Sequence, residues 1–127
     1  MDSNAYAKGI EMLERMVSPE IVEQTINKVA KFSPDFAQLI VEFPYGSIYS
    51  RPGLDMKQRA LVAITSLITQ GAFGQLDFHV HAGLNAGLTP NELIEAVMNC
   101  VPYTGFPKAI SGLFVIMQVL EARGVTS

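Results

Sequence analysis

The chain has 127 residues, of which 49% are hydrophobic and 17% charged, and its mean hydropathy is +0.26. This length suits one domain, which we expect to span residues 1–127, and it excludes a (β/α)₈ barrel or a two-domain dehydrogenase. A net charge of -3 and a pI near 5.3 argue against nucleic-acid binding. Charged residues are too few to cover a small monomer well, so we expect part of the surface to be buried in an oligomer.

No segment is typical of a signal peptide or a membrane span. The polar N-terminus, residues 1–11, lacks an apolar signal core. The longest apolar run, residues 61–67, is far shorter than the roughly 20 residues that span a bilayer. The single cysteine, Cys100, excludes an intrachain disulfide and a cysteine-rich zinc site. These features predict a soluble, cytoplasmic protein that does not enter a membrane.

Several helix starts are marked by a capping residue. A proline at the first helical position needs no N–H partner, and a preceding Ser or Thr oxygen accepts from a free amide. Three such pairs occur: Ser18-Pro19, Ser33-Pro34 and Thr89-Pro90. Thr89 and Glu92 also form a capping box, Asp55 is expected to cap another helix, and Gly87 is expected to end one.

The apolar residues follow helical spacing through most of the chain. We predict seven helices, over residues 3–16, 19–32, 34–45, 56–70, 74–86, 90–100 and 107–123. No long run alternates with period two, so strands are not expected. The predicted helix over 107–123 carries one regular stripe: Ile110, Leu113, Phe114, Met117 and Leu120. The helix over 74–86 is rich in small residues, and Gly83 indicates close packing against a neighbour.

The two histidines, His79 and His81, lie two residues apart on one predicted helix. They point in directions about 200° apart, so they cannot bind one metal ion together, and no metal site is predicted. Gln75 lies one turn before His79 on the same face. Histidine titrates near neutral pH and can act as a general acid or base. The pair therefore indicates either a polar reactive site or a core histidine held by a hydrogen bond.

The segment 43–53 is the second candidate, because it combines Tyr45, Tyr49 and Arg51 with glycines and prolines. An arginine in such a connection can bind a small carboxylate with its fork of donors. Alternatively, the tyrosines pack the loop and Arg51 pairs with a nearby carboxylate. Glu42 lies between apolar neighbours, and burial there would raise its pKa.

Tyr103 is the third candidate, in a segment over residues 101–107 where two prolines and a glycine interrupt the helical pattern. It indicates either a pocket wall or a corner between helices. Cys100 lies on an apolar stripe, where a cysteine serves either as a small hydrophobe or as a nucleophile.

Four segments together resemble the carboxymuconolactone decarboxylase family, within the alkylhydroperoxidase D-like superfamily. They occur in order and at matching spacing: Arg51-Pro52-Gly53-Leu54-Asp55 with Arg59 and Leu61; Gln75 with His79; Ala86-Gly87-Leu88-Thr89 with Glu92-Leu93-Ile94-Glu95; and Tyr103, Gly105, Pro107 and Ala109. The similarity covers about residues 10–120. It implies an all-α, alkylhydroperoxidase D-like domain of six to seven helices that forms a homo-oligomer, either a hexamer built as a trimer of dimers or a trimer.

The resemblance also implies an activity. The founding enzymes are lyases of aromatic catabolism that remove CO₂ from γ-carboxymuconolactone without a cofactor. The redox branch instead uses two cysteines and a glutamate, and those positions hold Ala72, Gln75 and Ala60 in this chain. A thiol–disulfide relay needs both sulfur atoms, so peroxidase activity is not expected. Gln75 also replaces a glutamate expected in the founding enzymes, and no tryptophan accompanies Tyr45 and Tyr49.

Two functions follow from these residues. In the first, the protein is a decarboxylase of a small carboxylated lactone: His79 donates a proton, Arg51 binds the carboxylate, and Gln75 and Tyr49 donate polarising hydrogen bonds. Tyr45, Glu42 and Tyr103 complete the expected substrate site. In the second, the same residues bind a small molecule without catalysis, since glutamine cannot exchange a proton at neutral pH.

Overall fold

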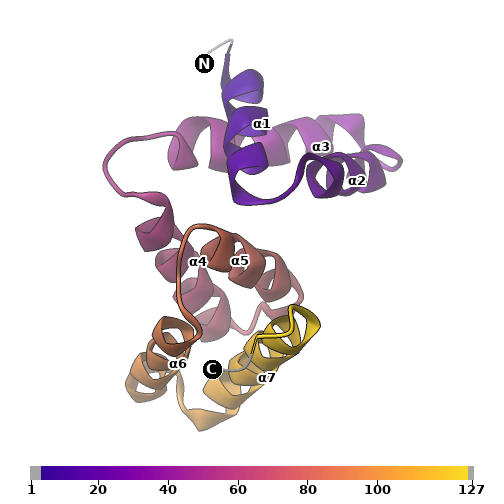
Figure 1. Cartoon of the computed structure of the whole chain (residues 1–127). Helices are drawn as coiled ribbons and strands as arrows, with labels where there is room; N and C mark the ends of the chain where they lie inside the picture. The colour runs from indigo at the N-terminus through magenta and orange to yellow at the C-terminus, as the bar shows by residue number, and fades with distance from the viewer. Residues whose placement is uncertain (1–3, 126–127) are drawn as a thin grey trace. The chain divides into compact units, whose positions relative to one another are not determined.

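The computed structural model describes residues 4–125, and they form two compact units that divide between Leu54 and Asp55. All regular secondary structure in these residues is helical, which confirms the predicted all-α class (Figure 1). Across residues 4–125, no helix combines the length and the apolar character needed to cross a bilayer. The expected single domain over 1–127 stays a prediction.

The N-terminal unit is built from four helical segments: α1 (Ala5–Met16), α2 (Pro19–Ala30), α3 (Pro34–Ile40) and the π-helix η1 (Val41–Tyr49). Two glycines bring α1 and η1 into backbone contact. A Cβ atom on Gly9 would collide with the Val41 carbonyl, and one on Gly46 would collide with the Ala5 carbonyl. Glycine is therefore required at both positions for the two helices to pack this closely.

The π-helix corrects two predictions. We expected an α-helix up to residue 45 and a connection from 43 to 53, but α3 ends at Ile40 and helical structure continues as η1 to Tyr49. Pro44 explains the change of helix type. In an α-helix its ring would clash with the carbonyl of Ile40, and the wider π turn begins directly after that residue.

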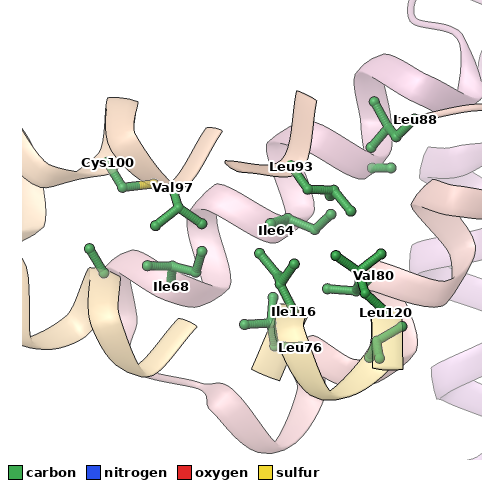
Figure 2. Close-up of a cluster of buried hydrophobic side chains, with 13 residues drawn as sticks. Ile64, Ile68, Leu76, Val80, Leu88, Leu93, Val97, Cys100, Ile116 and Leu120 are labelled. Carbon is green, nitrogen blue, oxygen red and sulfur yellow. The ribbon is translucent and has the colours of Figure 1, made fainter. Parts of the chain in front are cut away.

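The C-terminal unit contains α4 (Met56–Gln70), α5 (Phe73–Asn85), α6 (Pro90–Thr104) and α7 (Phe106–Ala122). Their inward faces meet in one apolar core (Figure 2), whose most enclosed members are Ile64, Ile68, Leu76, Val80, Leu93 and Ile116. A Cβ atom added to Gly83 would lie 2.8 Å from the Leu88 side chain and 3.4 Å from the Ala60 side chain. This confirms the close packing predicted for Gly83.

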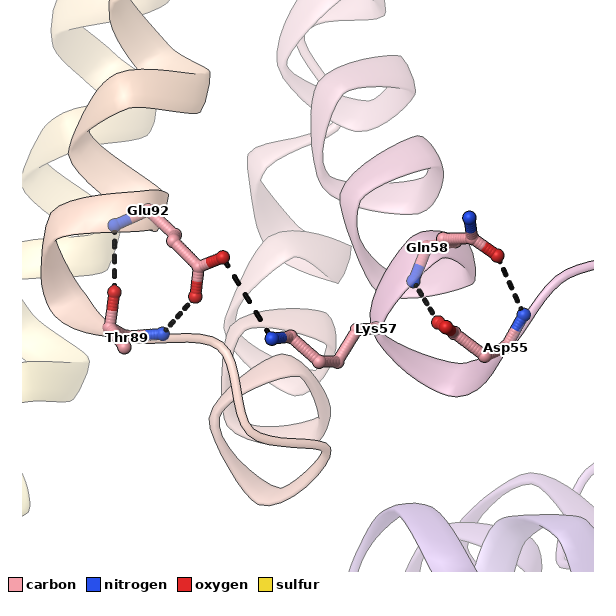
Figure 3. Close-up of polar contacts among 5 residues, drawn as sticks. All are labelled: Asp55, Lys57, Gln58, Thr89 and Glu92. Atoms are coloured by element: carbon pink, nitrogen blue, oxygen red, sulfur yellow. Dashed lines mark hydrogen bonds and ion pairs between the residues drawn. The ribbon is translucent and has the colours of Figure 1, made fainter.

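The predicted helix caps are all present. Ser18 and Ser33 accept hydrogen bonds from the amides of Ile21 and Phe36, at 3.4 and 3.0 Å. Two reciprocal capping boxes start helices of the C-terminal unit (Figure 3): Thr89 with Glu92 on α6, as predicted, and Asp55 with Gln58 on α4. Glu92 also pairs with Lys57 at 3.8 Å, which links the starts of α4 and α6. Gly87 follows the end of α5 with a φ of 106°, as a helix-terminating glycine does.

One further prediction for this unit is wrong. We expected the helix over 90–100 to end before Pro102, but α6 continues through it to Thr104. Pro102 lies in the last part of α6, where it removes one backbone hydrogen bond to the carbonyl of Met98, an exposed residue, and this loss is tolerated. The helix ends instead at Gly105, whose φ of 84° is left-handed.

The stripe predicted on the last helix is present, but most of it does not face the core. The buried face of α7 consists of Ala109, Gly112, Ile116, Val119 and Leu120. A Cβ on Gly112 would lie 2.8 Å from Ile68, so α7 approaches α4 through its small residues. The large side chains of Ile110, Phe114 and Met117 are left exposed as a consequence.

The contact between Gly9 and Val41 yields a stability prediction. Gly9→Ala should lower the free energy of unfolding by about 1–3 kcal/mol, because the added methyl group must displace backbone of η1. Gly74→Ala is the matched control: nothing lies within 4 Å of its added Cβ, so it should be neutral or stabilising by up to about 1 kcal/mol. Urea denaturation followed by circular dichroism measures both. Equal stability of the two variants would contradict the close approach of α1 and η1.

Candidate functional site

His79 is the most unusual polar residue in the C-terminal unit. It lies in the middle of α5 and is half-buried, and its ring meets that of Phe78 edge-on, with centroids 5.1 Å apart. Its Nδ1 atom is sealed from solvent and has no hydrogen-bond partner in the part of the chain that the structure describes. Burial lowers the pKa of His79 from the ordinary value of 6.5, so the imidazole is neutral at pH 7.

The buried Nδ1 also determines which nitrogen carries the proton. A proton on Nδ1 would create a buried N–H donor without an acceptor, which costs about 1–3 kcal/mol. A proton on Nε2 leaves only an unused lone pair inside. The favoured neutral form therefore has its N–H at Nε2.

Gln75 lies one turn before His79 on α5, in the first turn of the helix, and it is exposed. The structure thus places the two residues on neighbouring turns of one face, as predicted from their spacing. The Gln75 amide offers both donors and an acceptor at the open end of that face. The helix begins after Ala72 without a side-chain cap, and the Gln75 backbone amide donates instead to the Ala72 carbonyl at 3.1 Å.

His81 has a structural explanation. Arg123, just beyond α7, donates from Nε to His81 Nδ1 at 2.9 Å, and its Nη2 donates to the His81 carbonyl and to Asn85 Oδ1, at 3.2 and 3.0 Å. The Nε2 atom of His81 lies 3.8 Å from Asp77 Oδ1. Arg123 thereby attaches the end of α7 to α5, a contact across 42 residues for which the sequence carries no signal.

The other predicted residues of segment 43–53 belong to the N-terminal unit. Tyr45 and Tyr49 lie one turn apart on η1 with ring centroids 5.0 Å apart and planes tilted by 49°. Burial, and secondarily the neighbouring Tyr49, raises the pKa of Tyr45 to about 12, so this phenol remains a hydrogen-bond donor at neutral pH. Glu42, on the preceding turn, is half-buried and accepts a 2.7 Å hydrogen bond from Gln38 Nε2. Arg51 follows η1 and is exposed.

The two remaining candidates lie on α6. Tyr103 is 81% exposed in its last turn, next to the corner at Gly105. Cys100 is buried in the apolar core, and burial raises the pKa of its thiol, so it stays protonated at neutral pH and packs as a small hydrophobe. Within residues 4–125, no group of three or more His, Cys, Asp and Glu side chains is arranged to hold a metal ion.

Apart from Tyr103 and Cys100 on α6, the candidate residues form two groups. Glu42, Tyr45, Tyr49 and Arg51 lie in or directly after η1, whereas Gln75 and His79 share α5. The spacing of the residues in the sequence predicted which candidates lie close together on one helical segment. The spacing could not show that Nδ1 of His79 is buried, because the burial depends on side chains from elsewhere in the fold.

Comparisons with known proteins support a functional class. A sequence profile described as "Carboxymuconolactone decarboxylase family" matches residues 34–117, a range that includes all residues of both groups and crosses the division at Leu54. The 4-carboxymuconolactone decarboxylase of Acinetobacter baylyi is 30% identical over 124 residues, which cover 98% of this chain and 92% of that protein. The nitrosuccinic acid decarboxylase of Metarhizium robertsii is 31% identical over 116 residues, covering 91% and 81%.

A third relative, an uncharacterized 15.0 kDa protein of Paracoccus denitrificans, is 29% identical over 113 residues, with 87% of this chain and 84% of that protein covered. The resemblance predicted from the four segments is thereby confirmed. Two relatives of nearly equal identity are named for different substrates, so the similarity supports a decarboxylase-family role without selecting a substrate.

The environment of His79 predicts its titration. By nuclear magnetic resonance its ring should titrate with a midpoint below 6.5, and the neutral form should carry its proton on Nε2. The unfolded chain binds this proton near pH 6.5 and the folded chain only at lower pH. The stability contributed by neutral His79 is therefore lost as the pH falls below 6.5. His79→Asn assigns the signal, and a midpoint at or above 6.5 would contradict the burial of the ring.

Proposed function

This chain belongs to the carboxymuconolactone decarboxylase family, and on that basis we propose that it is a carboxy-lyase acting on a small carboxylated lactone such as γ-carboxymuconolactone. The observation that carries the proposal is the half-buried His79 imidazole, whose Nδ1 is enclosed without a partner and whose pKa is lowered by burial. Such a group is suited to proton transfer near neutral pH. Among the described residues, His79 is the histidine whose ring nitrogens are not occupied by another side chain.

The proposed reaction breaks one carbon–carbon bond. The bond between the ring carbon and its carboxylate cleaves, CO₂ leaves, and the electron pair delocalises into the conjugated lactone carbonyl as a dienolate. A proton then adds to carbon and restores the lactone. Because the substrate itself accepts the electron pair, the reaction needs no cofactor. Nitrosuccinic acid, the substrate in the name of one relative, meets the same requirement through its nitro group.

His79 is proposed to supply the proton. Free His79 is neutral, but the negative charges of a carboxylated substrate favour the imidazolium and raise the pKa of the ring on binding. The imidazolium then donates from Nε2 to carbon after CO₂ has left. The tautomer left behind carries its proton on the enclosed Nδ1, the less stable neutral form, which favours exchange through solvent back to the Nε2–H form. Gln75, one turn away, is proposed to donate a hydrogen bond that polarises the lactone carbonyl.

Arg51 is proposed to bind a substrate carboxylate, since its planar guanidinium offers two parallel donors to such a group. Tyr49 is proposed to donate a polarising hydrogen bond, and Tyr45, Glu42 and Tyr103 to contact the substrate. The raised pKa of Tyr45 supports a donor role for this phenol. We also propose that the protein works as a homo-oligomer, a hexamer of the trimer-of-dimers type or a trimer.

The test of the function is CO₂ release by the purified protein from γ-carboxymuconolactone, with nitrosuccinic acid and related lactones alongside. Turnover of the lactone is expected, and His79→Ala should reduce kcat by about 10²–10⁴-fold through loss of the proton donor. His81→Gln is the matched control on the same helix and should retain activity, because glutamine can still accept from Arg123.

Two outcomes would overturn parts of this proposal. Undiminished turnover by His79→Ala would remove His79 from the mechanism. Tight binding of the lactone, measured by calorimetry, without CO₂ release would favour the alternative of a small-molecule-binding protein, which the amide at Gln75 motivates.

The proposed role of Arg51 yields a separate prediction. Arg51→Ala should raise KM about 10-fold or more, because an arginine–carboxylate pair contributes about 1.5–3 kcal/mol. Lys31→Ala, which removes an exposed cation from the same unit, should leave KM unchanged. Steady-state kinetics on whichever substrate is turned over measures both. Equal KM values for the two variants would show that Arg51 does not bind the carboxylate.

A further inference from the structure

A small hollow opens on the N-terminal unit between α1 and the residue that follows η1. It has a volume of about 240 Å³ and is lined by Lys8, Glu11, Met12, Arg15 and Ser50. Pockets for drug-sized molecules usually measure about 300–1,000 Å³, so this hollow suits a ligand of only a few heavy atoms. None of these five residues takes part in the proposed decarboxylation.

Four of the lining residues share one face of α1. Lys8 and Arg15 are seven residues apart, close to two full turns, so their Cα atoms lie about 10 Å apart along the helix axis. Glu11 and Met12 lie between them on that face. Met12 is buried and forms an apolar floor, while the three charged residues are exposed. Two long cationic side chains can therefore reach a ligand beside Glu11 from both ends of the hollow.

The fifth residue, Ser50, is brought to the hollow by the close packing of α1 and η1. Gly46, one turn earlier, approaches the Ala5 carbonyl without room for a Cβ, and the Ser50 hydroxyl donates to the Gly46 carbonyl. A serine has one hydrogen to donate, so Ser50 Oγ meets a ligand as an acceptor. The Glu11 carboxylate is likewise an acceptor.

The hollow thus combines two cations with two acceptors. Lys8 and Arg15 attract an anion and donate hydrogen bonds to its oxygens, and the arginine can do so with two parallel N–H groups. The oxygens of Glu11 and Ser50 would face the lone pairs of such an anion without a hydrogen between them, unless the ligand brings one. The matching ligand is therefore an anion that carries an O–H or N–H group of its own.

We propose that this hollow is a binding site for a small oxyanion that also carries a hydrogen-bond donor. Two kinds of molecule share this chemistry: protonated phosphate, which keeps a P–O–H group, and a short hydroxy acid, which has a hydroxyl beside its carboxylate. In both cases Lys8 and Arg15 bind the charged oxygens, and Glu11 and Ser50 accept from the donor. The proposal is independent of the decarboxylase activity, because it uses none of the residues assigned to that reaction.

The test compares matched anions by nuclear magnetic resonance titration of the full-length, isotope-labelled protein near neutral pH. Phosphate is paired with sulfate and glycolate with acetate, and the second member of each pair lacks the donor. In at least one pair the donor-bearing anion should bind about 10-fold tighter, because it alone satisfies the two acceptors. The shifts should centre on the amides of Glu11, Met12 and Ser50. The pair that shows the preference distinguishes a phosphate site from a hydroxy-acid site.

Two variants with matched controls assign the roles of the charged residues. Arg15→Gln should weaken binding about 10-fold or more, whereas Lys31→Gln, which removes an exposed cation from the same unit, should leave it unchanged. Glu11→Gln provides an amide that can itself donate, so the preference for the donor-bearing anion should be lost. Glu14→Gln removes an exposed carboxylate of α1 outside the hollow and should keep the preference.

Equal affinities within both pairs, no binding by any of the four anions, or shifts centred away from α1 would overturn the proposal. A Glu11→Gln variant that binds all four anions more tightly but keeps the preference would also contradict it, because simple charge attraction behaves in that way. Circular dichroism verifies that the variants are folded, which is expected because Glu11 and Arg15 are exposed. The comparison of anions on the wild type needs no variant and decides the proposal by itself.

Discussion

Close helix packing through residues without large side chains is the constraint on which both units depend. Gly9 and Gly46 let the backbones of α1 and η1 touch, and Gly83 and Gly112 bring α5 and α7 against the large side chains of their neighbours. Each glycine gives up some helix propensity for this contact. The choice has a consequence for the surface: where a helix packs through its small residues, its large apolar residues remain outside, as on α7.

The properties of the candidate site follow from the same packing. His79 lies on a helix held tightly against the core by Leu76 and Val80, and this position encloses Nδ1 while the ring remains half-exposed. Enclosure lowers the pKa and selects the proton on Nε2, two properties that suit proton exchange with an anionic ligand. This enclosure has a cost, because a buried nitrogen without a partner lowers the stability of the fold.

The family assignment and the two named substrates point to a shared chemical requirement rather than to one molecule. Each substrate in those names carries a carboxylate, and its loss leaves an anion that the lactone carbonyl or the nitro group can stabilise. A protein site for such reactions must bind one carboxylate, stabilise the delocalised anion and return a proton. The residues Arg51, Gln75 and His79 have side chains suited to these three tasks, and this match is the physical basis of the proposed function.

The sequence by itself determined the all-α class, the starts of α2, α3, α4 and α6, and the placement of Gln75 and His79 on one helix face. Those features depend on interactions within about four residues, such as a capping oxygen and a free amide. Only the tertiary structure decided that α7 turns its small residues inward, that Arg123 occupies His81 and that Nδ1 of His79 is enclosed. An amphipathic pattern shows which residues share a face, but the shape of the neighbouring helix decides which face is buried. Here Ile68 leaves room for a glycine and not for a phenylalanine.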